Sequence, residues 1–530
     1  MGVLWYGGTF YSMEKEGDKM DAVFTSNGVI QAVGTERSLR ETYKNQITEE
    51  HNIKGATAYP GFVDSHLHII GHGEKLTHLD LSPMKSAEEV LAALEDRVQT
   101  MQKGEWLVGE GWNENQWEHP RILSKIELDE VAPDQPMILT RVCRHAILAN
   151  SKAIQLAGIH KDTPDPQGGL IERNDNGEET GFFLDTAQDI IKKVVPEVSE
   201  EYLKNLVEKS VDDLTRLGLV GGHTEDLNYY GGYKKTYQAF KRGINGKQRK
   251  FRAHLLIHHG VFDEVMEDGL DYGDGTGFIE LGAMKIFSDG ALGGRTAWLS
   301  EPYVDEPGNY GIPIHSDEEL EVLVKKAREK DMPVAVHAIG DKAAITIARL
   351  IEKYPLHKNR RDRIIHAQIV NSELLDILKR VPVVLDIQPT FVASDFPWVI
   401  ERVGLERAKQ SYPWKTFLEF GIPCAGGSDA PIESVNPLLG IQAAVLRQSS
   451  MDGKTYNEDQ CLTLYEAISL YTKGSAFAIS KENQMGKIAP GYVADFTILE
   501  EDLSQVEPSA ISQVKVMKTV IDEDVVYQTK

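Results

Sequence analysis

The middle of the chain alternates between two patterns of hydrophobic positions. Short runs of consecutive apolar residues, typical of buried parallel strands, occur near residues 61–63, 219–222, 251–257, 281–286, 334–336, 363–365, 382–385 and 422–426. Between them lie segments with an apolar residue at every third or fourth position, as at 203–214 and 320–327, which predict amphipathic helices. Eight strands that alternate with helices predict an α/β fold of the (β/α)8 TIM barrel type, since a doubly wound sheet usually stops at about five to seven strands.

The two ends of the chain share a different pattern. Short β-rich runs occupy residues 3–6, 22–26 and 29–33, and the dipeptide Asn27-Gly28 between the last two is a strong hairpin signal. Similar runs occur at 494–499, 514–521 and 525–527. We therefore expect residues 1–58 and 484–530 to form one small β-sandwich, with the barrel domain at residues 59–483.

One long interval interrupts the barrel pattern between its first and second strands. Residues 74–180 contain a helix signal after Ser86 and strand-like runs near 106–109 and 137–141. Structureless loops of this length are uncommon in compact domains. The interval therefore predicts an inserted subdomain over the mouth of the barrel.

Composition narrows the range of partners. The chain has 81 acidic and 57 basic side chains, a formal net charge of −24, and this charge disfavours binding to nucleic acid or to an anionic membrane surface. No run approaches about 20 uncharged apolar residues, so we expect no membrane span. Three cysteines without a CxxC pair fit a reducing compartment. We expect a cytoplasmic protein that binds a small-molecule substrate and, from the general frequency of twofold oligomers, forms a homodimer.

Candidate chemistry lies where the predicted strands end. His66 and His68 follow the first strand, His337 and His366 end the fifth and sixth, and Asp429 follows the eighth. The carboxyl ends of barrel strands meet at one face, so we expect these side chains to lie together. Four imidazoles and a carboxylate suit zinc or a similar divalent metal. Taken singly, each histidine also fits a hydrogen-bonded structural role, and Asp429 fits the cap of a turn.

Together these residues resemble the metal-ligand set of the amidohydrolase superfamily. The runs 285–293, 336–341, 366–368 and 427–431 resemble its amidohydrolase-3 branch, which includes enzymes similar to N-substituted formamide deformylase, and the likeness covers nearly the whole chain. The resemblance implies one or two metal ions per chain and a carbamate formed by CO2 on Lys285, at the end of the fourth strand. From the residues alone, an ordinary lysine paired with Asp289 is the favoured interpretation of Lys285.

The resemblance also implies a reaction. It predicts a metal-dependent hydrolase that cleaves a non-peptide C–N bond, of amide or formamide type, by means of a metal-activated hydroxide. His66, His68 and Asp429 would hold one metal and His337 and His366 the other, with carboxylated Lys285 between them. Asp429 would carry the proton of the water to the leaving nitrogen. Two alternatives stay open: a metal-dependent esterase or lactonase, and a catalytically silent regulatory relative.

Substrate contacts are predicted from weaker signals. Arg295 lies in a glycine-rich loop after the fourth strand, where it fits either anion binding or a tight turn. Trp112 belongs to the inserted segment and fits either a substrate-binding wall or a hydrophobic core. His145 stands in a run, Arg141-x-x-x-His145, that matches the same relatives.

Overall fold

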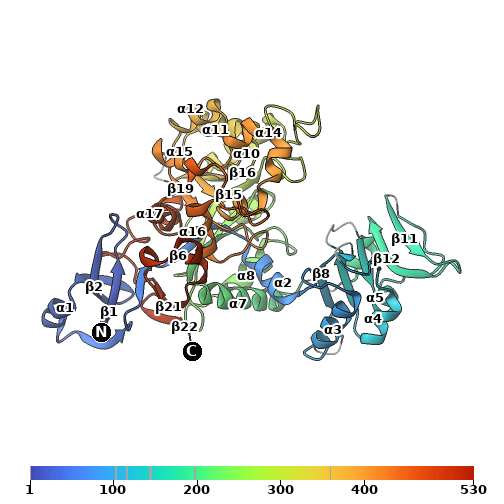
Figure 1. Ribbon diagram of the computed structural model, residues 1–530, viewed down its shortest axis with the longest axis horizontal. Coiled ribbons are helices and arrows are strands. Elements are labelled where there is room, and N and C mark those ends of the chain that lie inside the picture. Colours follow the sequence, from blue (N-terminus) through green and yellow to red (C-terminus); the bar gives the residue numbers. More distant parts are fainter. Residues whose placement is uncertain are drawn as a thin grey trace. The chain divides into compact units, whose positions relative to one another are not determined.

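The computed structural model describes residues 2–101, 104–114, 117–141, 146–166, 168–195, 198–357 and 360–529. The chain divides into two compact units. One unit contains the residues up to His72 together with those from Glu200 onward, and the other spans Gly73–Ser199. Figure 1 follows the chain through both units by colour.

The larger unit contains a barrel of eight parallel strands, as the hydrophobic pattern predicts. In the order in which they pair, the strands are β6 (Phe62–Leu67), β13 (Leu219–Thr224), β14 (Arg252–His258), β15 (Ile279–Phe287), β16 (Val334–Ala338), β17 (Asp362–His366), β18 (Val383–Ile387) and β19 (Cys424–Gly426). Two backbone hydrogen bonds join the first strand to the segment after the last. The Asp429 N–H donates to the His66 carbonyl and the His68 N–H donates to the Ala430 carbonyl, both at 2.7 Å.

Amphipathic helices connect the strands and surround them. In α10 (Asp317–Glu329) the buried residues are Leu320, Val324 and Ala327, and a complete capping box between Ser316 and Glu319 begins the helix. The helices of this unit are α1 (Glu36–Tyr43), α2 (Ile69–Thr77), which extends past His72, α7 (Glu200–Arg216), α8 (Tyr233–Gly243), α9 (Phe262–Glu267), α10, α11 (Asp341–Lys353), α12 (Ser372–Leu378), α13 (Thr390–Asp395), α14 (Trp398–Lys409), α15 (Trp414–Glu419), α16 (Pro437–Leu446), α17 (Leu464–Ser469) and α18 (Ser475–Ala478). Among the helices in the described part of the chain, none has both the length and the apolar composition needed to cross a membrane.

Strands from both ends of the chain pair in a second sheet of the same unit, and Figure 1 shows the blue strands β1 and β2 and the red strands β21 and β22 that contribute to it. The strands are β1 (Gly2–Tyr11), β2 (Lys19–Ser26), β3 (Val29–Gly34), β4 (Ile47–Asn52), β5 (Thr57–Pro60), β20 (Phe496–Leu499), β21 (Val516–Ile521) and β22 (Asp524–Gln528). Asn27 and Gly28 both have positive φ, 55° and 73°, as the predicted β2–β3 hairpin turn requires. The strands pair edge to edge in a single sheet, so the stacking of two sheets implied by a sandwich stays a prediction.

The smaller unit has its own sheet, in the order β11-β12-β10-β9-β8-β7. Its elements are β7 (Leu79–Asp80), α3 (Ala87–Val98), β8 (Leu107–Trp112), α4 (Lys125–Val131), β9 (Met137–Arg141), β10 (Ala146–Ala149), α5 (Ser151–Leu156), β11 (Gly169–Arg173), β12 (Glu179–Asp185) and α6 (Gln188–Lys192). The unit continues past residue 180 because β12 pairs with both β10 and β11. Separate apolar clusters, one around Leu139 and one around Ile147, give this segment its own core.

Candidate metal centre

Six sequence-predicted residues lie at or near the carboxyl ends of the barrel strands. His66, Lys285, His337 and His366 belong to β6, β15, β16 and β17, while His68 and Asp429 directly follow β6 and β19. Ligand atoms of His66, His366 and Asp429 all lie within 4.8 Å of one another. The structure therefore brings together side chains from the first, sixth and eighth strands, which are far apart in the sequence.

The distances between these side chains are those of groups that can share a cation. His66 Nε2 lies 3.4 Å and His68 Nε2 lies 3.5 Å from Oδ1 of Asp429. Atoms that bind one tetrahedral zinc at about 2.0–2.2 Å stand roughly 3.3–3.6 Å apart. The ring of His366 lies 5.6 Å from that of His66 and 4.5 Å from that of His337, measured between centroids. His337 is thus joined to the cluster through His366.

Three of the four histidines have one ring nitrogen fixed by an oxygen acceptor. The contacts are His68 Nδ1 with the Glu225 carbonyl (2.6 Å), His366 Nδ1 with Gln388 Oε1 (2.8 Å) and His337 Nε2 with the Gly290 carbonyl (3.1 Å). A nitrogen that donates its proton to such an oxygen leaves a lone pair on the other nitrogen of a neutral ring. These contacts therefore set both the tautomer and the direction of each imidazole.

The backbone around Asp429 is tightly constrained. The Asp64 carboxylate accepts hydrogen bonds from the His66 N–H (3.0 Å) and the Ser428 N–H (3.1 Å), so it joins the first strand to the segment after the eighth. A Cβ at Gly427 would stand 2.6 Å from the His66 nitrogen and 2.8 Å from Asp64 Oδ1, which explains the glycine. Asp429 itself has φ +58°, a left-handed conformation that aspartate tolerates better than most residues.

The side chain of Lys285 is buried inside the barrel. It is fully buried, and its ammonium makes no hydrogen bond to any described residue, lying 4.4 Å from the Phe287 ring centroid. Burial lowers the pKa of this lysine from 10.5 to about 8. The alternative that Lys285 pairs with Asp289 is wrong, because the Asp289 carboxylate instead accepts the backbone N–H groups of Trp298, Ile339 and Gly340.

Burial keeps most of the imidazoles neutral. It lowers the pKa of His366 to about 4, and it holds the pKa values of His66 and His337 well below the ordinary 6.5. His68 differs: burial again favours its neutral form, but Asp429, together with the charges of Asp226 and Glu225, outweighs this and raises the pKa of His68 to about 9. Because cations bind the neutral ring, a metal ion would replace the proton that His68 shares with Asp429.

Several residues that support the site had no role in the sequence-based prediction. Asp64, Glu225 and Gln388 each contact a predicted ligand or its backbone, and all three are buried. Glu225 and Gln388 stand immediately after barrel strands, so a rule that considers every polar residue at a strand end would have found these two, whereas Asp64 lies within β6. A buried pair below the site, Arg363 and Asp386 (Nε to Oδ2, 2.7 Å), also binds the first strand through the Ser65 carbonyl.

The residues predicted to bind substrate are not brought to this cluster by any described contact. Trp112 is buried in the core of the Gly73–Ser199 unit, next to Trp117. The guanidinium of Arg295 pairs with the Asp305 carboxylate at 2.8 Å, and Arg295 has φ +56° in its turn. His145 lies outside the described residues. Their roles in substrate binding stay predictions.

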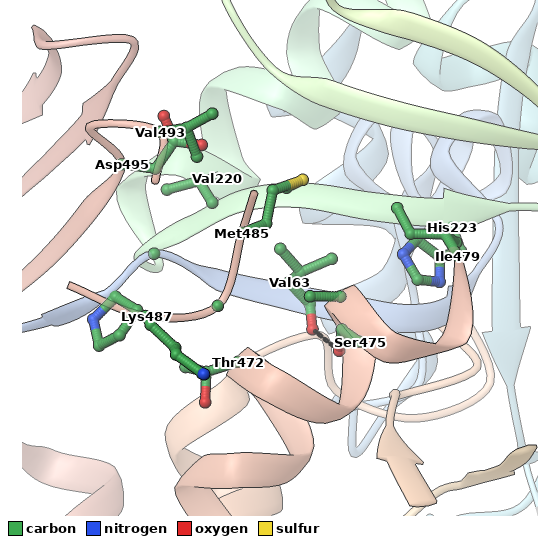
Figure 2. Close-up of a pocket in the computed structure, with 14 residues that line it drawn as sticks. Val63, Val220, His223, Thr472, Ser475, Ile479, Met485, Lys487, Val493 and Asp495 are labelled. Carbon is green, nitrogen blue, oxygen red and sulfur yellow. Dashed lines mark hydrogen bonds between the residues drawn. The ribbon is translucent and has the colours of Figure 1, made fainter. Parts of the chain in front are cut away.

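The barrel also contains a small pocket that does not fit a reaction site. It lies near the amino ends of the strands, between the start of β6 and the segment 472–495, where Val63, Val220, Ile479 and Met485 form an apolar wall beside His223 (Figure 2). Its volume is about 10 Å³, roughly the space of one water molecule. None of the six predicted ligands is among the described residues that line it.

Comparisons with known proteins agree with this architecture. The sequence model of a family described as the amidohydrolase family matches residues 49–527. The protein YtcJ of Bacillus subtilis (strain 168) is 51% identical over 530 residues, covering 100% of both chains. N-substituted formamide deformylase of Arthrobacter pascens is 26% identical over 532 residues, covering 96% of this chain and 95% of that one. A crystal structure of an uncharacterized metal-dependent hydrolase from Pyrococcus horikoshii superposes with a TM-score of 0.82 at 28% identity, covering 96% of this chain and 99% of that one.

Proposed function

The chain belongs to the amidohydrolase family, and from this membership we propose that it hydrolyses a non-peptide C–N bond of amide or formamide type in a small molecule. The observation that carries the proposal is the cluster of His66, His366 and Asp429, whose ligand atoms lie within 4.8 Å of one another. The match with a formamide deformylase along nearly all of both chains supports the substrate class.

The donor set fits a divalent cation. His66, His68 and Asp429 would hold one ion, and His337 and His366 would hold a second, with carboxylated Lys285 between them. Neutral imidazoles and a carboxylate are ligands that zinc accepts. When bound there, zinc polarises a carbonyl and lowers the pKa of a water molecule.

Asp429 acts as the acid–base group of the proposed reaction. The histidines beside it outweigh the effect of burial and hold the pKa of this carboxyl below its ordinary 3.8, so it is ionised at neutral pH. An ionised carboxylate can take a proton from the attacking water and deliver it to the leaving nitrogen. The delivery matters because an amide nitrogen leaves readily only as a neutral amine.

Lys285 is proposed to react with CO2. The ammonium would first lose one proton to give the neutral amine, which would then attack the carbon of CO2. An N–C bond would form as one C–O π bond opens, and loss of a second proton to solvent would leave an anionic carbamate. Full burial lowers the pKa of Lys285 to about 8, so a larger share of this amine is neutral at pH 7 than in an exposed lysine. An anion at this place would suit two cations, which a lysine ammonium would repel.

The proposal is tested by metal analysis and by a matched substrate panel. We expect one or two equivalents of zinc in the purified protein, and a carbamate carbon signal by NMR after exposure to ¹³C-bicarbonate. Formamides, N-acyl amines and cyclic amides should be hydrolysed faster than their ester counterparts, with activity lost on chelation and restored by zinc. Hydrolysis of the esters alone would support an esterase or lactonase instead. A fully metal-loaded protein inactive on both series would support a regulatory role.

A further inference from the structure

Glu225 lies beside the candidate metal centre, where backbone hydrogen bonds hold it in place. It follows β13 at the carboxyl end of the strand and is fully buried. Its N–H donates to the Leu67 carbonyl at 3.2 Å, and its own carbonyl accepts from His68 Nδ1 at 2.6 Å. The backbone of Glu225 therefore makes two hydrogen bonds to the adjacent residues Leu67 and His68.

The side chain of Glu225 has one oxygen with a partner and one without. Oε2 accepts a hydrogen bond from the Tyr229 hydroxyl at 3.1 Å, which fixes the carboxyl group. Oε1 is buried and makes no hydrogen bond to the residues that the structure describes. A buried carboxylate oxygen without a partner is unfavourable unless a positive charge faces it.

The charged groups that act most strongly on Glu225 are predicted ligands of the candidate metal centre. Burial raises the pKa of its carboxyl, and Lys285 is the charge that opposes this most strongly, followed by His68. Conversely, Glu225 is the charge that acts most strongly on Lys285. Asp226, the next residue, also has one buried oxygen without a hydrogen bond to the described residues, Oδ1, while its Oδ2 accepts from the Thr224 hydroxyl and the Ile70 N–H. Glu225 is distinguished from Asp226 by the backbone carbonyl that binds His68 and by its effect on Lys285.

We propose that Glu225 is a positioning residue of the metal centre: its carbonyl orients His68, and its carboxylate, held by Tyr229, supplies negative charge that stabilises the cation bound there. This inference rests on the metal centre of the proposed function but not on the substrate class. Groups that act on a metal through its ligands commonly change metal affinity about 10- to 100-fold when they are removed.

The test is the zinc affinity of the full-length protein, measured by competition with a chromogenic chelator. Glu225→Gln removes the charge at nearly constant volume and should weaken zinc binding by about 10- to 100-fold. Glu225→Asp keeps the charge and should recover most of the affinity. Glu280→Gln is the matched control, because Glu280 is another glutamate of the barrel but lies near the amino end of β15, paired with Lys481 at 3.1 Å. It should bind zinc as the wild type does.

Each outcome of this experiment decides the question. Wild-type zinc affinity in Glu225→Gln would overturn the role of Glu225 while leaving the proposed function intact. An equal loss in Glu225→Gln and Glu280→Gln, or no recovery in Glu225→Asp, would also overturn it, because the effect would then be one of general packing. A wild-type protein that binds no zinc would refute the metal centre itself. Circular dichroism of the metal-free variants separates a folding defect from a loss of affinity.

Discussion

At the residue scale, the chemistry of the candidate centre depends on which atom of each side chain is already bonded. His68, His337 and His366 each have one nitrogen held by an oxygen acceptor, so the opposite nitrogen of each ring is the one that can bind a cation. Asp429 lies beside two of the histidines through a single oxygen, Oδ1. In the proposed reaction, its second oxygen would move the proton.

Replacement of Asp429 by asparagine separates proton transfer from metal binding. Asp429→Asn keeps the size of the side chain but removes its basicity, so turnover of an amide substrate should fall by about 10²- to 10⁴-fold. Most of the zinc should remain, because the histidines are unchanged. His337→Ala provides the contrast and should lose metal content itself. Wild-type turnover in Asp429→Asn would show that another group carries the proton.

At the element scale, the centre depends on how closely β6 approaches the segment that follows β19. Asp64 bonds to both sides of this junction, and Gly427 leaves no space for a side chain. The junction thus fixes His66 and Asp429 relative to each other before any cation binds. A small displacement here would alter two ligands at once.

Alanine at position 427 tests this junction. The added Cβ would stand 2.6 Å from the His66 nitrogen, so the backbone must shift, and overpacking of this kind costs about 1–3 kcal/mol. We expect Gly427→Ala to lower both the free energy of unfolding in urea and the affinity for zinc. Gly277→Ala is the control, since no atom of the described residues lies within 4 Å of its added Cβ. Equal behaviour of the two variants would contradict the argument.

The strands of the barrel, but not the extent of the inserted unit, could be predicted from the sequence alone. The eight barrel strands were predictable because each is a buried apolar run, and the β2–β3 hairpin was predictable from Asn27-Gly28. The extent of the inserted unit was not, because the pairing of β12 with β10 joins residues that no local pattern connects. The supporting residues Glu225 and Gln388 were missed for a similar reason: their roles arise from contacts with distant histidines. A carbamate on Lys285 follows from resemblance alone.

At the scale of the whole molecule, many histidines are buried in the barrel in their neutral form. Burial lowers the pKa values of His366 and His258 to about 4, and it also lowers those of His66, His223, His254 and His337. An unfolded chain protonates these same side chains near pH 6.5. At these side chains the unfolded state therefore binds more protons than the folded state between these pH values, and this contribution favours unfolding in acid. The buried carboxyls of Asp64, Asp289 and Asp395 contribute in the opposite direction, because burial raises their pKa values to about 7.

The difference at the histidines predicts how their contribution to stability depends on pH. The contribution of the neutral histidines is fully present above about pH 6.5 and declines as the pH falls toward about 4. Because the buried carboxyls oppose this trend in the overall stability, the measurement that checks it must report on the imidazoles themselves. In ¹⁵N NMR of the metal-free protein in the presence of a chelator, the rings of His366 and His258 should stay neutral at pH 5.5. Ring nitrogens that titrate near pH 6.5 would contradict the neutral state of the buried imidazoles.

The junction between β6 and the segment after β19 has one more consequence. The backbone groups that close the cylinder, at His66, His68 and Asp429, belong to the same residues whose side chains face the candidate cation. A bound ion would therefore join the first strand of the barrel to the segment after the last strand, which are separated by about two thirds of the chain. Contacts between such distant segments are the slowest to form, because long loops must close first. Metal binding would thus stabilise the closed barrel in addition to supplying the chemistry of the site.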